Sequence, residues 1–350
     1  MEQKSKLMFA SDYQEGAHPS IIKRLSDTNL MATPGYGSDA ICASAKERIR
    51  RACACPDAMV ELLIGGTQTN ATVIDALLRS CQGVISADSG HVNVHEAGAI
   101  EFGGHKVLAL PGKFGKLRAP QIRQYLEDFC NDGNNEHMVM PGMVYISQPT
   151  EFGTLYSRKE LAAIHAVCRE YKIPLYIDGA RLAYALASPD NDVSLKDLAV
   201  LSDVFYIGGT KCGALFGEAV VVPDPRLIPH FFTIIKQHGA LLAKGRLLGI
   251  QFDELFRDDL YLDIGKTAVR YAQDIQEALR KAGYELLFDS PTNQVFFIIE
   301  NSRIPALESE VECSFMEKYD ENRTILRLCT SWASSGEAVR RLCGILTRRV

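Results

Sequence analysis

The sequence lacks both a long apolar run and a basic cluster. No stretch of apolar residues reaches the length of a membrane-spanning helix. Its 38 Lys and Arg residues are outnumbered by 43 Asp and Glu residues, giving a formal net charge of −5. This balance argues against nucleic acid as a partner. Residues 1–12 lack the apolar core of a signal peptide, so we expect a cytoplasmic protein.

Patterns that mark several other classes of protein are also missing. The ten cysteines are scattered and no C-x-x-C spacing occurs, so we interpret most of them as small buried thiols rather than metal ligands or disulfides. Internal repeats and low-complexity segments are absent from the sequence. With 47% hydrophobic and 23% charged residues, the composition is that of an ordinary globular protein.

Residues 60–222 alternate between short apolar strands and amphipathic helices. This alternation predicts an α/β fold with a mostly parallel sheet covered by helices. Helix starts are also visible: Ser38 or Asp39 is placed to cap one helix, and Ser157 another.

The pattern changes in the C-terminal third. Long helical segments are predicted over 229–256 and 259–282, followed by short strands and a closing helix. We therefore expect a large domain over residues 15–247 and a smaller α+β domain over 248–350, with residues 1–14 near the smaller one.

Lys211 stands in a loop between two apolar runs that we predict to be buried strands. The flanking sequence contains four glycines: Gly208, Gly209, Gly213 and Gly217. So little side-chain bulk lets a ligand approach closely, and a desolvated lysine forms Schiff bases with carbonyl compounds. The alternative is an ordinary solvated lysine in a loop.

Residues 65–70, with the sequence Gly-Gly-Thr-Gln-Thr-Asn, directly follow a predicted strand and precede a helix predicted over 71–78. Free backbone N–H groups and the helix dipole make such a turn an anion site, usually for phosphate. The motif is neither a Walker loop nor GxGxxG, and glycine can also serve there only to bend the chain.

His91, His95 and Glu96 are grouped after the next predicted strand. Their spacing is not that of the H-E-x-x-H zinc motif. An imidazole here can stack on a planar ring, act as a base, or be purely structural.

Asp178 and Arg181 follow another predicted strand, over 173–177. An aspartate there lies where open α/β sheets bind ligands, although it can equally be the N-cap of a helix over 179–186. Because all these groups follow strands, we expect them at one edge of the sheet. Arg327, on a strand of the smaller domain, can point back to the same place.

Four motifs occur together in one order: residues 65–70, residues 90–99, Asp178-Gly-Ala-Arg181 and Thr210-Lys211. In this the chain resembles the threonine aldolase and β-eliminating lyase family of fold-type I pyridoxal phosphate enzymes. The resemblance extends from Ser11 to Arg327. It implies a large domain with a mostly parallel, seven-stranded type of sheet between helices, and a smaller C-terminal α+β domain.

The resemblance also implies roles at the cofactor. Lys211, next to Thr210, would bind pyridoxal 5'-phosphate as a Schiff base. Asp178 would pair with the pyridinium nitrogen, which makes the ring an electron sink. His91 would stack on the ring face. Gly66 and Thr67 would bind the phosphate.

Further roles follow for the substrate. Ser11, Arg181 and Arg327 would bind the carboxylate of an amino acid, since guanidinium can bond it at two places; Arg181 would also contact the cofactor. Arg246 and Lys244 would reach a phosphate of a neighbouring subunit, so we expect a homodimer or homotetramer. The resemblance implies no metal.

The implied reaction is cleavage of the Cα–Cβ bond of a β-hydroxy-α-amino acid, with threonine or allo-threonine giving glycine and acetaldehyde. Many threonine aldolases carry a histidine near the substrate hydroxyl where this chain has Glu151. The base is therefore open among His91, His95, Glu151 and a water molecule. Alternatives are β-elimination, transamination, another β-hydroxy amino acid, or a non-catalytic ligand-binding protein on this scaffold.

Overall fold

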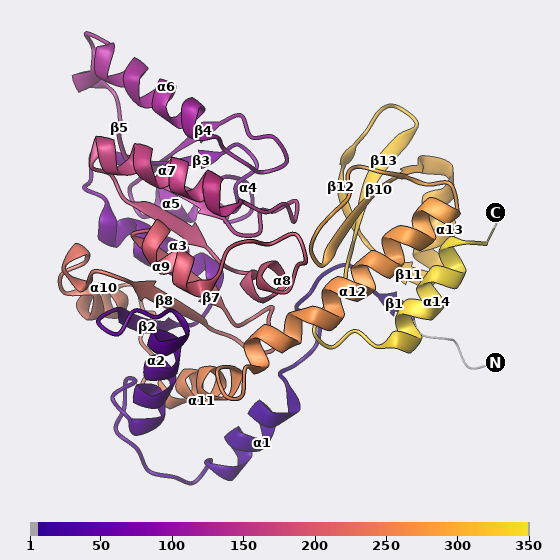
Figure 1. Ribbon diagram of the computed structural model, residues 1–350, viewed down its shortest axis with the longest axis horizontal. Helices are drawn as coiled ribbons and strands as arrows, with labels where there is room; N and C mark the ends of the chain where they lie inside the picture. The colour runs from indigo at the N-terminus through magenta and orange to yellow at the C-terminus, as the bar shows by residue number, and fades with distance from the viewer. Residues whose placement is uncertain (1–5, 349–350) are drawn as a thin grey trace.

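The computed structural model describes residues 6–348 and has two parts joined by a long helix (Figure 1). The larger part is built on a seven-stranded sheet in the order β2-β8-β7-β6-β5-β3-β4. Its strands are β2 (Met59–Leu63), β3 (Gln82–Ala87), β4 (Lys106–Leu110), β5 (Met140–Ser147), β6 (Leu175–Asp178), β7 (Val204–Gly208) and β8 (Glu218–Val222). Strand β8 runs antiparallel to both of its neighbours, β2 and β7, and all the other neighbouring strands of this sheet are parallel to each other. The predicted α/β fold with a mostly parallel sheet is confirmed.

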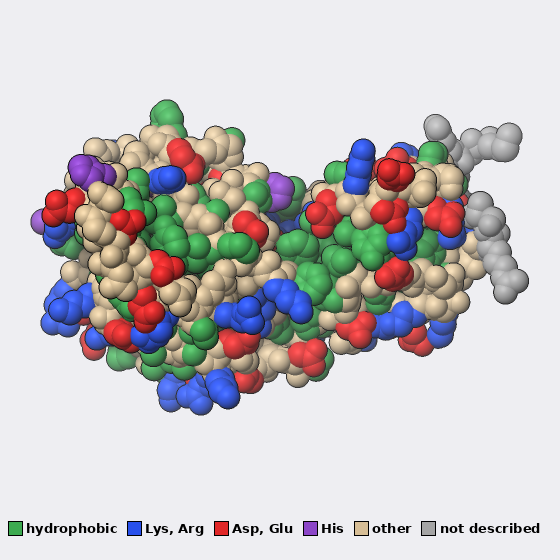
Figure 2. All heavy atoms as spheres, turned by 90° about the horizontal axis from the view of Figure 1, so that it is seen from above, with side chains coloured by type: hydrophobic (Ala, Val, Ile, Leu, Met, Phe, Trp, Pro, Cys, Tyr) green, Lys and Arg blue, Asp and Glu red, His purple; other side chains and the backbone are tan. Residues whose placement is uncertain are grey.

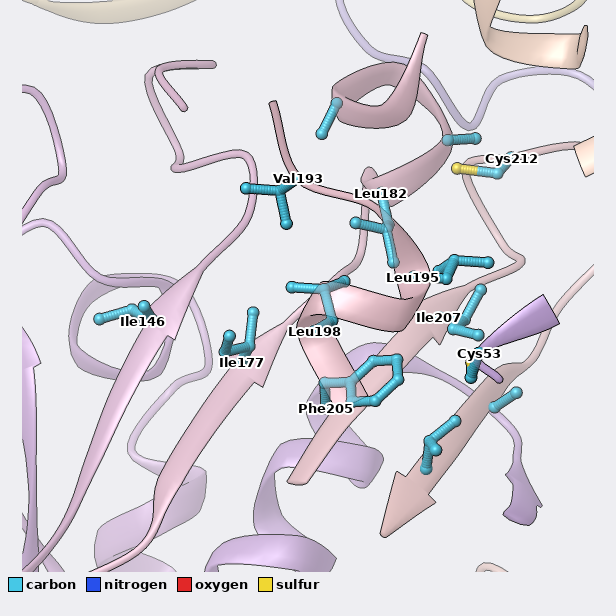
Figure 3. Packing of buried hydrophobic residues seen from close by; sticks show 14 of the residues in the cluster. Cys53, Ile146, Ile177, Leu182, Val193, Leu195, Leu198, Phe205, Ile207 and Cys212 are labelled. Carbon is cyan, nitrogen blue, oxygen red and sulfur yellow. The ribbon is translucent and has the colours of Figure 1, made fainter. Parts of the chain in front are cut away.

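Apolar side chains cover both faces of this sheet, as expected where helices bury both sides. One face packs against α1 (Pro19–Asp27), α2 (Ala40–Ala52), α6 (Ala119–Asn131), α7 (Arg158–Tyr171), α8 (Leu182–Leu186), α9 (Leu195–Leu201) and α11 (Arg246–Leu255). Figure 3 shows Ile177, Leu198 and Phe205 meeting in this layer. The opposite face packs against α3 (Gly66–Leu77), α4 (His91–Val94), α5 (Ala99–Phe102) and α10 (Phe231–Gln237).

Two helix N-caps agree with the prediction from the sequence. The Asp39 carboxylate accepts hydrogen bonds from the first turn of α2, and Ser157 forms a capping box with Glu160 at the start of α7. The single helical segment predicted over 229–256 is wrong. The chain leaves α10 at Gln237 and enters α11 only at Arg246, and Gly239 between them has a φ of +66° that favours glycine.

The smaller part is a four-stranded antiparallel sheet covered by helices. Its order is β12-β13-β10-β9, with β9 (Glu285–Leu286), β10 (Gln294–Glu300), β12 (Ser314–Lys318) and β13 (Arg323–Cys329). Helices α12 (Leu260–Lys281), α13 (Ile304–Glu310) and α14 (Gly336–Leu346) accompany it. Strand β1 (Leu7–Met8) pairs with β11 (Val311–Glu312), which brings residues near the N-terminus into this part. Short 3-10 helices occur at Asn135–His137, Pro225–Leu227 and Asn301–Arg303.

Helix α12 connects the two parts (Figure 1). Its N-terminal residues up to Val269 join the core of the larger part, and those from Ala272 join the core of the smaller one. Helix α11 packs against α1 and α2 of the larger part. We therefore propose a domain boundary within α12 rather than at residue 248.

The surface dips between the two parts (Figure 2). Over residues 6–348, no helix combines the length and the apolar composition needed to cross a membrane.

Candidate active site

One cavity of about 340 Å³ lies where strands β5, β6 and β7 end. Its wall includes most of the residues that the sequence singled out: Gly66, Thr67, His91, Glu151, Asp178, Arg181, Thr210 and Lys211. The predicted convergence at one edge of the sheet is therefore confirmed. Ser11, His95, Lys244, Arg246 and Arg327 lie outside this wall. A larger depression of about 810 Å³, between α2, α9 and α12, contains none of the predicted residues.

Asp178 is held as an ionised acid at the bottom of the site. The hydroxyls of Tyr145 and Tyr206 donate to its carboxylate at 2.6 and 2.5 Å. Asn70 Nδ2 and the Ala180 N–H donate at 3.0 and 2.9 Å. Burial raises the pKa of Asp178, but these hydrogen bonds more than offset it, so the pKa lies below the usual 3.8. A buried carboxylate of this kind suits a cationic partner.

Asp178 is not the N-cap of a helix, which was the alternative interpretation of this residue. Helix α8 begins at Leu182, and Arg181 occupies the N-cap position. The residue after Asp178 is glycine because the chain passes directly over β7. A Cβ atom on Gly179 would lie 2.0 Å from the carbonyl oxygen of Tyr206. Sheet packing therefore accounts for Gly179.

Lys211 lies in the loop between β7 and β8, and its side chain lines the cavity. Its backbone carbonyl accepts a hydrogen bond of 2.6 Å from Tyr184. Burial and the nearby guanidinium of Arg181 lower the pKa of Lys211 below its usual 10.5. The alternative of an ordinary solvated lysine is wrong, and the lowered pKa favours the nucleophilic free amine.

Glu218 is a site residue that the sequence analysis missed. It begins β8, lines the cavity and is 3% exposed. Its carboxylate accepts hydrogen bonds from Thr210 Oγ1 at 2.8 Å and from the Gly209 N–H at 3.0 Å. Thr210 Oγ1 in turn accepts one from the Gly217 N–H at 3.0 Å. The only signal in the sequence is a charged residue at the start of an apolar strand.

The start of α3 forms the anion-binding part of the cavity. The helix begins at Gly66, earlier than predicted, so Gly66 and Thr67 belong to its first turn. The first N–H groups of a helix have no intrahelical partner, and the dipole adds positive potential. Gly65 is the N-cap, and open space surrounds the position its Cβ would take. This geometry matches the predicted phosphate site.

His91 is fixed by a carboxylate that the sequence analysis left without a role. Its Nδ1 lies 2.7 Å from Oε1 of Glu96, whose side chain is fully buried. Asn70 Nδ2 donates to the same oxygen at 2.7 Å, and Tyr176 donates to Asn70 Oδ1 at 2.9 Å. His95 is exposed, with its ring centre 5.8 Å from that of His91. His91 therefore belongs to the site, and His95 lies at its margin.

Glu151 is half-buried between β5 and α4. Its Oε1 accepts hydrogen bonds from Ser147 Oγ at 2.7 Å and from the backbone N–H of His91 at 2.9 Å. Burial raises the pKa of Glu151 above its usual 4.5 despite these bonds. A raised pKa moves a carboxyl group toward the range in which it exchanges protons near neutral pH.

Arg181 is held by Asp12, a second residue that the sequence analysis left unassigned. Arg181 Nε and Nη2 donate to the two oxygens of Asp12 at 2.6 and 2.9 Å. Asn293 also donates to Asp12, at 2.9 Å. Burial raises the pKa of Asp12, but Arg181 and Lys211 lower it, overall to about 2. The ion pair joins residues 169 positions apart, which no local pattern reveals.

Arg327 reaches toward the site from β13 of the smaller part. Its Nη2 donates to the carbonyl of Ala10 and to Ser314 Oγ, both at 3.2 Å, and its Nη1 to Gln294 Oε1 at 3.1 Å. Arg327 therefore contacts the backbone of the residue that precedes Ser11.

Lys244 and Arg246 lie away from this cavity. Lys244 is exposed, and the Arg246 guanidinium donates to backbone carbonyls of Thr28, Asn29 and Met31. Within one subunit they therefore do not contact the cofactor site.

Residues 6–348 contain no group of three or more His, Cys, Asp and Glu side chains arranged to hold a metal ion.

Residues 9–301 match the family model described as beta-eliminating lyase. The chain belongs to this family. A low specificity L-threonine aldolase of Pseudomonas aeruginosa is 32% identical over 337 residues, covering 95% of each chain. The solved structure of a threonine aldolase from Leishmania major is 42% identical, covers 97% of this chain and 98% of its own, and has a TM-score of 0.94. Thermus thermophilus aspartate aminotransferase, at 14% identity and a TM-score of 0.71, shows only the shared fold.

As a member of the beta-eliminating lyase family, the chain is a pyridoxal phosphate-dependent lyase of fold-type I. The donor set fits that cofactor. An anion site begins α3, an ionised acid suits a pyridinium nitrogen, and Lys211 has a lowered pKa, all on one cavity.

Proposed function

We propose that this lyase cleaves the Cα–Cβ bond of a β-hydroxy-α-amino acid, with threonine or allo-threonine giving glycine and acetaldehyde. The observation that carries the proposal is the shared cavity of Lys211, Asp178 and Glu151, with the guanidinium of Arg181 on its wall. The related threonine aldolases of Pseudomonas aeruginosa and Leishmania major support the same reaction.

Pyridoxal phosphate, when bound, supplies an electron sink for the electrons of the broken bond. Lys211 would hold it, with its amine kept nucleophilic by burial. Asp178 would keep the ring nitrogen protonated, because its carboxylate is ionised and its hydrogen-bonding tyrosines fix its position. Gly66 and Thr67 would bind the phosphate, and His91 would cover the ring face.

The substrate carboxylate would lie between Arg181, Ser11 and Arg327. Asp12 occupies Nε and Nη2 of Arg181, which leaves Nη1 for the substrate. The Arg327 guanidinium donates a hydrogen bond to the carbonyl of Ala10, the residue that precedes Ser11, whereas Asp12, the partner of Arg181, follows it. Two cations in fixed positions orient the amino acid as well as bind it.

Glu151 would accept the proton of the β-hydroxyl group. It lines the cavity, whereas His95 does not, and its pKa is raised by burial. His91 is engaged by Glu96 through Nδ1, which suits a role in positioning the ring. Glu151 would then return the proton to water or to product.

The test is product identification with purified enzyme and pyridoxal phosphate. We expect glycine and acetaldehyde in equal amounts from L-threonine or L-allo-threonine, with acetaldehyde measured by NADH-linked reduction. D-Threonine and other β-hydroxy amino acids define the stereochemical and substrate preference. Pyruvate or a 2-oxo acid with ammonia, and no glycine, would instead establish β-elimination. No product from any of these substrates would contradict the proposal.

We propose that Lys244 and Arg246 act in a neighbouring subunit, in an assembly of at least two copies. Arg246 anchors the loop after α1, in which Leu30 is 96% exposed and Met31 is 53% exposed. Exposed apolar residues of this size suit a protein interface. Light scattering would show a dimer or tetramer, and a monomer at micromolar concentration would contradict the proposal.

A further inference from the structure

Glu218 lies between the two strands that lead to opposite sides of the cofactor site. In the sheet it pairs with Leu63 of β2 and with Gly208 of β7. Strand β2 leads into the anion-binding first turn of α3, and β7 leads into Thr210 and Lys211. Glu218 therefore sits at the end of the cavity where we place the cofactor phosphate.

The hydrogen-bond partners of Glu218 are not cations. Its two oxygens accept from the Thr210 hydroxyl and the Gly209 N–H. Among residues 6–348 it forms no ion pair with Lys, Arg or His within 4 Å. The titratable groups that face it from the packed elements are Lys211 after β7, Asp178 and Tyr176 on β6, Tyr206 on β7, Cys212, and Tyr261 on α12. Lys211 is the only cation in this group, and in the proposed function its amine binds the cofactor.

A phosphate at the start of α3 would therefore share its end of the cavity with a buried carboxyl group. Two like charges at one buried site raise the proton affinity of the acid. We propose that Glu218 is protonated whenever the cofactor phosphate is bound, and that in alkaline solution it takes up this proton from solvent as the phosphate binds. The acid is then a neutral hydrogen-bonding member of the phosphate site.

The electrostatics of the cofactor-free protein support this inference. Burial, the largest cause, raises the pKa of Glu218 to about 8. Below that pH the acid is already neutral, so phosphate binding needs no proton. Above it, each binding event must return a proton to Glu218, and affinity falls by up to roughly tenfold per pH unit.

The experiment measures binding rather than turnover, so its outcome does not depend on the proposed aldol cleavage. The probe is pyridoxine 5'-phosphate, which has the phosphate but no aldehyde to react with Lys211. Pyridoxine, without the phosphate, is the control ligand. Titration calorimetry of cofactor-free enzyme at pH 8.5, in buffers of different ionisation enthalpy, counts the protons taken up. Phosphate esters are fully ionised at this pH, since their second pKa is about 6.

We expect wild-type enzyme to take up most of one proton per site with pyridoxine 5'-phosphate and less with pyridoxine. Glu218→Gln should lose the extra uptake that the phosphate group causes, and the ratio of its affinities for pyridoxine 5'-phosphate and pyridoxine should be equal at pH 7 and pH 9.5. In wild-type enzyme this ratio should fall about tenfold or more over that range. The matched control is Glu61→Gln on β2, whose carboxylate pairs with Lys46 at 2.7 Å; it should behave as wild type.

Two results would overturn the inference. Equal proton uptake with and without the phosphate group in wild-type enzyme would show that phosphate binding adds no proton to Glu218. Extra uptake with the phosphate ester that persists in Glu218→Gln would assign the proton to another group, such as Lys211. The first comparison uses only wild-type protein, so it decides the matter even if the variant does not fold.

Discussion

Nδ1 of His91 and Oε1 of Glu96 lie 2.7 Å apart, and Asn70 joins this pair to Asp178. The single amide nitrogen of Asn70 donates to both carboxylates, while Tyr176 donates to its amide oxygen. A carboxylate oxygen is a hydrogen-bond acceptor, so this pairing suits the tautomer of His91 that has its hydrogen on Nδ1. His91, which we propose covers the cofactor ring, and Asp178, which we propose pairs with its nitrogen, are thus held by one network.

We expect Glu96→Gln to lower kcat roughly tenfold or more with little change in KM, because the His91 ring loses its charged anchor. Steady-state kinetics and visible circular dichroism of the bound cofactor would measure this. Glu101→Gln, on the exposed side of α5, is the matched control. A kcat within twofold of wild type and an unaltered dichroism band would mean that Glu96 only fills space.

Glu151→Gln should lower kcat by about a hundredfold or more, as loss of a general base does. In the proposed reaction the ionised carboxylate of Glu151 is the base, and its pKa is raised. Wild-type kcat should therefore rise with pH through an inflection above 4.5 and be lost on the acid side. The variant should lack this inflection. If the inflection persists in Glu151→Gln, another group accepts the proton.

Asp12→Asn should raise KM for the amino acid roughly tenfold, with a smaller change in kcat, because Arg181 loses the partner that orients its guanidinium. The folded pKa of Asp12 is depressed to about 2, so the carboxylate is ionised at every pH above that value. The ratio of variant to wild-type KM should therefore be constant between pH 6 and 9. A ratio that changes across this range would contradict the assigned pairing.

Gly179→Ala should destabilise the protein by about 1–3 kcal/mol or more, since its Cβ would lie 2.0 Å from the Tyr206 carbonyl oxygen. We expect a melting temperature several degrees lower and weaker cofactor binding. Gly133→Ala is the control, because nothing lies within 4 Å of its added Cβ. Equal melting temperatures for the two variants would show that β6 and β7 can separate at this point.

The elements that were predicted correctly depend on interactions between residues close in sequence. The side chains of Asp39 and Ser157 accept hydrogen bonds from backbone N–H groups two or three residues away, so these caps can be predicted from the sequence alone. The order of apolar runs predicted the parallel sheet, and the polar groups after them predicted the edge at which the cavity lies. The break in the segment 229–256 was missed although it has a local signal. Gly239, at a φ of +66°, follows α10, and the Ala240 N–H bonds to the Ile235 carbonyl, as in a glycine-capped helix end.

By itself the sequence determined the fold class, the family resemblance and most of the predicted residues that line the cavity, since strand-end motifs carry them. Only the tertiary structure decided which acids stand beside them. Asp12 meets Arg181, Glu96 meets His91 through the shared amide of Asn70, and Glu218 joins the Lys211 loop because the sheet register aligns β8 with β2 and β7. The physical reason is that these contacts join segments distant in the chain. The burial and neighbouring charges that shift the pKa values of Asp12 and Glu218 likewise exist only after those segments have packed together.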